Sequence, residues 1–447
     1  MSSIKYDRVV KYKLSGKTDS PLHIGSSFGD PEEVLTDPDS GLPFIQASSL
    51  AGMLRSISTN LFDCELTTLI FGNNKDNFAE DSNHASRVKV TDGVMDPSSV
   101  RLETRPNISI DRKTGTVSSE TNSGQKYDIT YISPDARFSF YVYLFIQSDK
   151  QSDLVDKLQT IFGTFRDGHI GLGAKKSSGA GKFIIESIKS ASYDLRNNDQ
   201  RYAWANEEDD TDLRDITGKC FSSESPVKYN ITVKANTDGP IQIKSIAMSR
   251  FGENVPDSEN IMDGRENYII PGTSIRGTIR SQMEKIASYQ DKSSIINSAF
   301  GFAGNEYSEG HCGNLIFNDC IIGKREDIDI NPIRNRIHID KFTGGVMNQA
   351  FFKEKNASGK VDIMVQILNK QNPEASLGLL LYALRDLAVK TINLGNGYAT
   401  GKGFLNVSEI NIKSDDLCAT LLFENGSITD DDKIIENALR ALKEVSE

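Results

Sequence analysis

The spacing of apolar residues changes from a period of two to a helical period at two places in the chain. Alternating segments at Tyr12–Gly16 and Tyr229–Val233 predict strands, because side chains of a strand point to opposite faces in turn. After a polar loop, each is followed by apolar residues at helical spacing, with Ser48 and Thr273 as the predicted N-caps. The helical sets are Leu50, Met53, Leu54, Ile57 and Leu61, then Ile275, Ile279, Met283 and Ile286.

The remaining elements also occur in pairs. Short strands at Val88–Thr91 and Leu315–Asn318 precede strongly β-like runs at Phe138–Phe145 and Val361–Leu368. A second amphipathic helix, a glycine-rich segment and a last strand then close each half, and a final helix is expected at about 430–445. The order β-α-β-β-α-β predicts an α+β fold of two tandem ferredoxin-like (RRM-like) domains with hairpin insertions and glycine-rich loops.

An internal repeat supports this division. Six blocks recur in the same order at a nearly constant offset, which predicts a duplicated unit. We expect a first domain at 1–190, an exposed acidic linker at 191–226 and a second domain at 227–447. The clearest pairs are Thr18–Ile24 with Thr237–Ile243, Ser49–Ser56 with Ser274–Ser281, Arg105–Val117 with Arg334–Val346, and Gly171–Gly173 with Gly395–Gly397.

Composition places the chain among soluble globular proteins. Of its 447 residues, 37% are hydrophobic and 25% charged, and neither a long apolar run nor a signal-peptide core is present, so we expect a cytoplasmic protein. Five widely spaced cysteines do not indicate a disulfide framework. His311 and Cys312 with Cys320 are at most half a zinc site, and buried or edge-strand cysteines are the plainer interpretation.

The net charge of −11 argues against a protein that binds nucleic acid over its whole surface. A local basic groove is still compatible with it. We therefore expect basic residues to gather in the glycine-rich loops and first helices, and acidic residues in the linker and the C-terminal region.

Several segments together resemble one known family. These are Pro21–Gly25, Leu42–Gly52, the insertion beginning Ile110-Asp-Arg-Lys-Thr-Gly and the glycine-rich segment before the last strand, each with a counterpart in the second half. The set resembles the RAMP superfamily, and within it the backbone subunits of type III CRISPR effector complexes, in particular the tandem fusion of type III-D systems. The resemblance implies guide CRISPR RNA, target RNA and other RAMP and large-subunit proteins as partners, and no membrane.

Two features of each half would hold guide RNA in such a subunit. Helix N-termini bind phosphates, which nominates Ser49 and Arg55 in the first half and Ser274, Arg276 and Arg280 in the second. The glycine-rich segments offer close backbone approach and positive charge, and they are neither a Rossmann fingerprint nor a P-loop. Solvated arginines and a flexible turn are the alternatives. The nominated residues of the segments are Gly171, Gly173, Lys175, Lys176, Lys182, Gly395, Gly397 and Lys402.

The insertion reads locally as a hairpin with an Asp-x-x-Thr-Gly turn. In the family this hairpin is a thumb that crosses the guide–target duplex and displaces one base pair. The resemblance therefore assigns Arg105, Ile110, Arg334 and Ile339 to two thumbs, whereas Asp111 and Asp340 are expected to shape the turns.

The loop before the first helix carries the candidate catalytic residues, Asp30 and Asp257. In the family one aspartate of this loop serves RNA cleavage, which needs a base or a ligand for a divalent metal, Mg²⁺ or Mn²⁺, beside the 2′-hydroxyl. The spacing here is one residue longer than in the family, so other acids of the loop remain candidates. These are Glu32, Asp37, Asp39 and Asp263.

The resulting hypothesis is an RNA endonuclease subunit that cuts guide-paired target RNA at two sites about six nucleotides apart, one for each repeat. The alternatives are a non-catalytic scaffold with the same RNA contacts, a guide-processing RAMP endonuclease, and a regulatory ferredoxin-like module. The five histidines do not repeat between the halves, which disfavours a shared histidine mechanism.

Overall fold

The computed structural model describes residues 6–25, 32–73, 85–108, 110–111, 126–147, 153–167, 171–206, 210–222, 225–245, 255–302, 304, 310–323, 333–423 and 426–445. The protein is a mixed α+β structure. It divides into two compact units, and most of each unit comes from one sequence repeat. The first consists of 1–102, 130–176 and 180–225, and the second of 103–129, 177–179 and 226–447.

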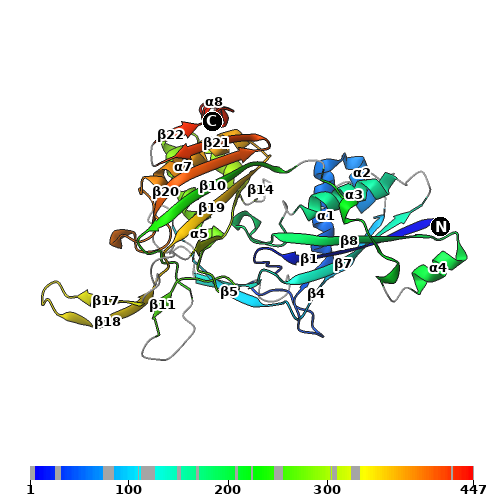
Figure 1. Cartoon of the computed structure of the whole chain (residues 1–447), viewed down its shortest axis with the longest axis horizontal. Helices are drawn as coiled ribbons and strands as arrows, with labels where there is room; N and C mark the ends of the chain where they lie inside the picture. The colour runs from blue at the N-terminus through cyan, green and yellow to red at the C-terminus, as the bar shows by residue number, and fades with distance from the viewer. Residues whose placement is uncertain are drawn as a thin grey trace. The chain divides into compact units, whose positions relative to one another are not determined.

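The first unit is built on one sheet with the strand order β2-β4-β7-β1-β8-β9, in which β3 also pairs with β7 (Figure 1). Strand β1, helix α1, strands β3 and β7, helix α3 and strand β8 follow one another in the predicted order β-α-β-β-α-β. The strands are β1 (Arg8–Thr18), β2 (Phe44–Ile45), β3 (Val88–Val90), β4 (Gly93–Met95), β7 (Arg137–Ile146), β8 (Phe183–Asp194) and β9 (Arg214–Asp215). The helices are α1 (Ala47–Leu61), α2 (Cys64–Phe71), α3 (Asp153–Arg166) and α4 (Asn198–Ala205).

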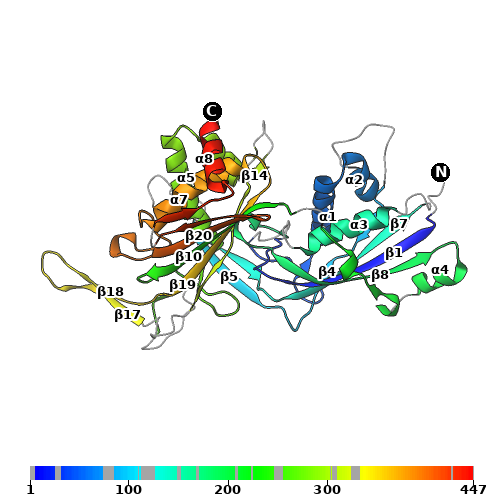
Figure 2. The same ribbon diagram turned by 45° about the horizontal axis from the view of Figure 1, so that its top comes forward.

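Alternation along β1 and β7 places apolar side chains on the face that α1 and α3 cover (Figure 2). Tyr12 and Leu14 are fully buried there, and the Tyr12 ring meets Phe162 of α3 edge-on at 5.1 Å. Leu50, Leu54 and Ile57 of α1 complete the core of this unit, as their helical spacing predicts.

The second unit repeats the arrangement with the order β12-β16-β19-β10-β20-β21-β22 and with β15 beside β19. Helices α5, α7 and α8 bury their apolar faces in its core. The elements are β10 (Val227–Asp238), β12 (Ile269–Ile270), α5 (Gly272–Tyr289), α6 (Ser294–Phe300), β13 (Gly301–Phe302), β14 (His311–Cys312), β15 (Leu315–Phe317), β16 (Cys320–Gly323), β19 (Lys360–Leu368), α7 (Pro373–Ala388), β20 (Phe404–Ser414), β21 (Leu417–Leu422), β22 (Ser427–Thr429) and α8 (Ile434–Glu444).

The insertion of the second repeat forms an antiparallel hairpin, β17 (Ile333–Ile339) and β18 (Val346–Lys355), that extends beyond the sheet of its unit (Figures 1 and 2). At its turn, the Asp340 carboxylate accepts hydrogen bonds from the backbone N–H of Phe342 (2.9 Å) and the hydroxyl of Thr343 (3.1 Å). Asp340 therefore shapes the turn, as predicted. In the first repeat, β5 (Leu102–Ile108) pairs with β6 (Lys126–Ile132), and the turn lies outside the described residues.

Residues 191–226 differ from the expected exposed linker. Strand β8 continues to Asp194, α4 follows it, and β9 pairs with β8. Ile216 and Cys220 then enter the core of the first unit, Cys220 with no exposed surface. Two apolar anchors within a polar stretch are too sparse to give a periodic signal, which explains why the sequence pattern did not predict them.

Among the described residues, no helix is long and apolar enough to cross a membrane.

Candidate nucleic-acid interface

The N-terminus of the first helix is capped in the same way in both units. The N–H of Ala47 donates to Asp92 Oδ1 (2.6 Å), and the N–H of Gly272 donates to Asp319 Oδ1 (2.8 Å). The predicted side-chain caps Ser48 and Thr273 are wrong, because both helices begin earlier and a carboxylate from the strand region supplies the acceptor. Ser49 and Ser274 lie half-buried in the first turn, with their N–H groups bonded to Gln46 and Pro271.

The three arginines of these helices contact protein groups. Arg55 donates to the carbonyl of Gly72 (3.0 Å), and Arg276 donates to that of Phe300 (3.1 Å). Both carbonyls lie at the C-terminal end of the following helix, where a cation is favourable. Arg280 pairs with Glu284 (2.8 Å) and lies over the Phe300 ring. Contact of these arginines with RNA phosphate remains a prediction.

Gly277 offers a direct test of close RNA approach to α5. A Cβ added there would meet nothing within 4 Å, and the residue is exposed, as is its counterpart Gly52. Gly277→Ala should therefore stabilise the protein by about 0.5–1 kcal/mol, because alanine favours a helix interior more than glycine does. If guide RNA lies against the helix, the same variant should bind guide RNA more weakly. Thermal unfolding and guide-RNA titration measure the two effects, and unchanged RNA affinity would contradict close approach.

The glycine-rich segments are equivalent, but in a different register from the predicted one. The N–H groups of Ala174 and Asn396 donate to the carbonyls of His23 (2.9 Å) and Gln242 (2.8 Å) respectively. Gly173 therefore corresponds to Gly395, and the predicted match of Gly173 with Gly397 is wrong. Both glycines have positive φ, and a Cβ would lie 2.1 Å from the His23 carbonyl or 2.5 Å from that of Gln242. This backbone contact requires glycine. Gly171 lies two residues before Gly173 in the first segment, and Gly397 lies two residues after Gly395 in the second, so these two glycines are not counterparts.

The four nominated lysines have different surroundings. Lys175 and Lys176 are exposed, while Lys182 is half-buried, and that burial lowers its pKa. Lys402 is only 7% exposed, and its Nζ binds Glu354 Oε2 (2.5 Å) and Gln242 Oε1 (3.2 Å). The Lys402 ammonium thus serves a buried ion pair in this structure.

The thumb residues also divide into buried and exposed. Arg105 is 8% exposed and pairs with Glu103 (2.7 Å) and with Asp319 (2.6 Å), the same aspartate that caps α5. Its counterpart Arg334 is exposed on β17. Ile110 and Ile339 are both more than half exposed, and Phe342 at the hairpin tip is completely exposed.

The candidate catalytic loop is described in the second unit only from residue 255 onward. There Asp257 is exposed and fixed to β18: its N–H donates to the Lys353 carbonyl (2.7 Å), and its Oδ2 accepts from the Lys353 N–H (2.6 Å). Asp30 lies outside the described residues. The carboxylates of Asp37 and Asp263 accept backbone N–H groups of their own turns, from Ser40 (2.8 Å) and Asn267 (2.8 Å), so both shape turns.

The two loops are offset by one residue from the predicted match. Val34 bridges Gly25, and Asn260 bridges Lys244 in the same manner. The N–H of Leu35 likewise donates to Ile24 (2.8 Å) as that of Ile261 does to Ile243 (2.8 Å). This register aligns Asp257 with position 31, a proline, and Asp30 with Pro256. Asp30 and Asp257, the two predicted catalytic residues, therefore do not occupy the same position of the repeat. Glu32 and Asp39 remain candidates in the first loop.

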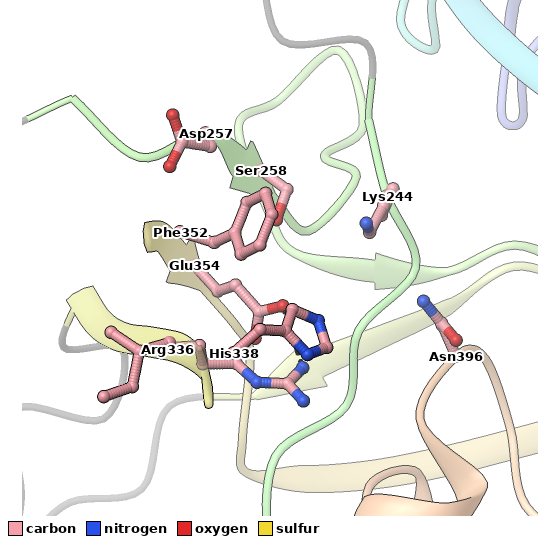
Figure 3. A pocket seen from close by; sticks show the side chains of 9 residues that line it. Lys244, Asp257, Ser258, Arg336, His338, Phe352, Glu354 and Asn396 are labelled. Carbon is pink, nitrogen blue, oxygen red and sulfur yellow. Dashed lines mark hydrogen bonds and ion pairs between the residues drawn. The ribbon is translucent and has the colours of Figure 1, made fainter. Parts of the chain in front are cut away.

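A cavity of about 490 Å³ in the second unit brings three of the predicted motifs together (Figure 3). Asp257 comes from the loop, Arg336 and His338 from the thumb, and Asn396 from the glycine-rich segment. In Figure 3, Lys244 and Asn396 lie on one side of the cavity and Asp257 on the other. The other lining residues are Ser258, Ile337, Phe352 and Glu354.

A buried polar chain holds the walls of this cavity. Ser258 accepts from the Gln242 amide (3.0 Å), Gln242 accepts from Lys402, and Lys402 pairs with Glu354. Glu354 also binds Arg336 (3.1 Å) at the cavity surface. Desolvation raises the pKa of Glu354, but the hydrogen bonds and charges of Lys402 and Arg336 together lower it by a larger amount. The pKa of Glu354 therefore lies below its ordinary value. The cavity therefore combines a fixed, exposed carboxylate with exposed cations from two directions.

Sequence patterns did not nominate Asp92, Asp319, Glu354, Arg336 or Lys244. Asp92 and Asp319 follow equivalent short strands and occupy one alignment column of the repeat, which is a signal that could have identified them. Glu354 and Arg336 have no such signal, because their partners are distant in sequence.

The sequence profile of the RAMP superfamily matches residues 16–184 and 236–406. The chain therefore belongs to the RAMP superfamily, and the two matched regions are the two repeats. No curated protein sequence matches the chain. One similar solved structure is a chain of the cryo-EM structure of the type III-B Cmr-β complex bound to cognate target RNA, at 20% identity and a TM-score of 0.31. The match covers 41% of this chain and 61% of that chain.

Proposed function

We propose that this RAMP protein is a backbone subunit of a type III CRISPR effector complex, built from two tandem ferredoxin-like domains. It binds guide CRISPR RNA, which selects the target by base pairing. It cleaves the paired target RNA at two sites about six nucleotides apart, one for each repeat. Its partners are guide and target RNA and the other RAMP and large-subunit proteins of the complex. The observation that carries this proposal is the cavity where loop, thumb and glycine-rich segment meet.

The cavity residues suit cleavage by the neighbouring 2′-hydroxyl. Lys244 and Arg336 are exposed cations that attract the phosphate, and Glu354 fixes the Arg336 guanidinium. Asp257 is held by Lys353 through one oxygen, so its other oxygen is available to accept the 2′-hydroxyl proton. In the second unit only, His338 lines the same cavity, where it could donate a proton to the leaving 5′-oxygen; the first repeat has Ser109 at this position, so the histidine is not part of a mechanism shared by both units.

The thumb hairpin positions the RNA in this proposal. Its tip carries Phe342 with its whole side chain exposed, and Ile337 and Ile339 of β17 are about half exposed. Apolar side chains inserted between bases unstack them and kink the strand. A kinked strand turns one phosphate toward the Asp257 cavity, where the 2′-hydroxyl and the leaving oxygen can come into line.

The donor set fits a divalent cation held mainly by RNA. The described residues contain no group of three metal-binding side chains, and Mg²⁺ is commonly bound by one or two carboxylates together with substrate phosphates. In the alternative to proton transfer, the same oxygen of Asp257 would hold Mg²⁺ or Mn²⁺, and the bound cation would stabilise charge on the phosphate. In either case Lys244 and Arg336 hold the phosphate.

A chemically modified target tests the mechanism. In the assembled complex with Mg²⁺, a 2′-deoxy substitution at the nucleotide before one cleaved phosphate should abolish that cut and leave the other unchanged, because the nucleophile is removed at one site only. Products are resolved on a sequencing gel. The matched control carries the deoxy substitution one nucleotide away. Continued cleavage at the substituted position would contradict attack by the 2′-hydroxyl.

The loop register favours a second candidate, in which only the second unit cleaves and the first is a scaffold. Asp257 aligns with Pro31, so the first loop has its aspartate one position earlier. The aspartate of the first loop therefore does not occupy the repeat position of Asp257. In that case, the target would be cut once for each copy of the chain.

A further inference from the structure

The face of the first sheet opposite its helices carries a compact set of cations and aromatic rings. On β1, Tyr12 and Leu14 face the helices, so Lys11 and Lys13 lie on the opposite face. Tyr143 and Tyr141 of β7 are their cross-strand neighbours. Lys89 of β3 is opposite Tyr143, and Lys189 of β8 is opposite Lys13. We call these six residues the Lys–Tyr face: Lys11, Lys13, Lys89, Tyr141, Tyr143 and Lys189.

The rings and ammonium groups of this face interact directly. The Nζ atoms of Lys11 and Lys13 lie 4.7 and 5.5 Å from the centre of the Tyr141 ring. Lys89 lies 5.9 Å from the Tyr143 ring, and the two tyrosines are stacked with centroids 6.4 Å apart. Half-buried rings beside cations are the arrangement on which proteins stack the bases of single strands.

A carboxylate already occupies the centre of the face. Asp210 Oδ1 accepts from Lys11 (3.2 Å), and Oδ2 accepts from Lys13 (2.5 Å) and from the Tyr141 hydroxyl (2.9 Å). Lys11 is only 7% exposed, so this anion site is built into the sheet. Burial raises the pKa of Asp210, but the hydrogen bonds from Lys13, Tyr141 and Lys11 together lower it by a larger amount. The pKa of Asp210 therefore lies below its ordinary value. Two ammonium groups and a phenol suit a phosphate equally well.

The second unit shows that the fold does not require this chemistry. The N–H groups of Thr18 and Thr237 make equivalent bonds to Ala136 and Gly359, which fixes the register between the two sheets. At the positions of the Lys–Tyr face, the second sheet has only uncharged side chains. They are Asn230 for Lys11, Thr232 for Lys13, Ile316 for Lys89, Met364 for Tyr141, Gln366 for Tyr143 and Asn411 for Lys189.

We propose that the Lys–Tyr face is a binding site for single-stranded RNA, with a backbone phosphate replacing the Asp210 carboxylate and bases stacking on Tyr141 and Tyr143. The stacked rings favour RNA over an acidic protein segment, for which only the charges would be needed. Asp210 acts as an internal competitor that RNA displaces. This site requires neither a guide nor cleavage and goes beyond the proposed function.

Binding of a labelled oligouridine of about 15 nucleotides to the full chain tests the proposal. The Lys13→Thr/Tyr141→Met double variant takes the side chains of the second sheet and should lose affinity about tenfold, because each stacked base contributes about 1–3 kcal/mol. Asp210→Asn should raise affinity about threefold or more by removing the competing charge. Ultraviolet cross-linking should label the peptide 137–147.

Lys234→Thr is the matched control, because Lys234 lies on the face of the second sheet opposite its helices, in a partly exposed pair with Glu409 (3.1 Å). It removes one positive charge and should change affinity less than twofold. Equal losses for the control and the Lys13 variant, or cross-links confined to other peptides, would overturn the proposal. Equally tight binding of polyglutamate would overturn the assignment to RNA. Cleavage of the target should stay unchanged in these variants, which separates this proposal from the proposed function.

Discussion

Glu354→Ala should destabilise the second unit by about 3–5 kcal/mol, because it leaves a buried ammonium without its counter-ion. The side chains of Glu354 and Lys402 are each only 8% exposed, and their charged atoms are 2.5 Å apart. Gln242 would remain as a neutral partner of Lys402, but it cannot replace the charge. Urea unfolding of the full chain, followed by a probe in the second unit, measures the loss.

Arg336→Ala is the control for this change. Arg336 binds the other oxygen of Glu354 but is 43% exposed, so its removal should cost less than about 1 kcal/mol. The stabilisation should depend on pH, because the pKa of Glu354 is lowered by folding. It should be complete above the ordinary glutamate pKa and disappear as pH falls through the lower pKa of the folded state. A loss below 1 kcal/mol for Glu354→Ala would instead mean that the Lys402 ammonium reaches solvent.

Asp257→Asn should abolish one of the target-RNA cuts, with a rate loss on the order of 100-fold or more, and leave RNA binding unchanged. An asparagine oxygen can keep the hydrogen bond from the Lys353 N–H, so the loop should stay in place. What is lost is the negative charge that accepts a proton or holds the cation. Single-turnover cleavage by the assembled complex measures the rate at each position.

Asp263→Asn is the matched control, since Asp263 lies in the same loop. Its carboxylate accepts the N–H groups of Arg265 (3.0 Å) and Asn267 (2.8 Å) within its own turn. The variant should cleave at the wild-type rate within about twofold, because an amide oxygen can accept the same bonds. Loss of cleavage in Asp263→Asn with none in Asp257→Asn would move the catalytic role to the turn.

The repeated elements could be predicted from the sequence because their signals are local. Tyr12 and Leu14 alternate with polar residues on one strand, and Leu50, Leu54 and Ile57 recur on one helix face, so burial follows from spacing alone. Asp340 shapes its turn through bonds to residues two and three positions away. Such contacts are fixed by neighbours that the sequence places side by side.

The chemistry of the candidate site could be predicted only in part, because burial and pairing depend on distant residues. The position of Lys402 in a glycine-rich segment suggests an exposed side chain. In the structure, however, Lys402 forms a buried ion pair with Glu354 of the thumb strand β18. Arg105 looks like an RNA contact of the thumb, yet Asp319 binds it. The predicted pairing of Gly173 with Gly397 was wrong because the alternative partner, Gly395, is also a glycine. Only the backbone carbonyl that each glycine approaches distinguishes the two pairings.

The charge distribution shows the same limit. The acidic segment was expected to lie apart from basic residues, but Asp210 binds Lys11 and Lys13, nearly 200 positions earlier in the chain. The clustered cations of the two units accordingly differ in place. The first unit has the Lys–Tyr face together with Lys175 and Lys176, and the second has Lys244 and Arg336 at the Asp257 cavity.

The most direct measurement is the product ladder of a guide-matched target RNA cut by complexes that carry wild-type protein, Asp30→Ala or Asp257→Ala. We expect two cuts about six nucleotides apart with the wild-type protein, each lost in one variant and kept in the other, with target binding unchanged. Loss of a single cut in Asp257→Ala and no effect of Asp30→Ala would assign cleavage to the second unit alone. An unchanged ladder in Asp257→Ala would exclude Asp257 as a catalytic residue and the Asp257 cavity as a cleavage site.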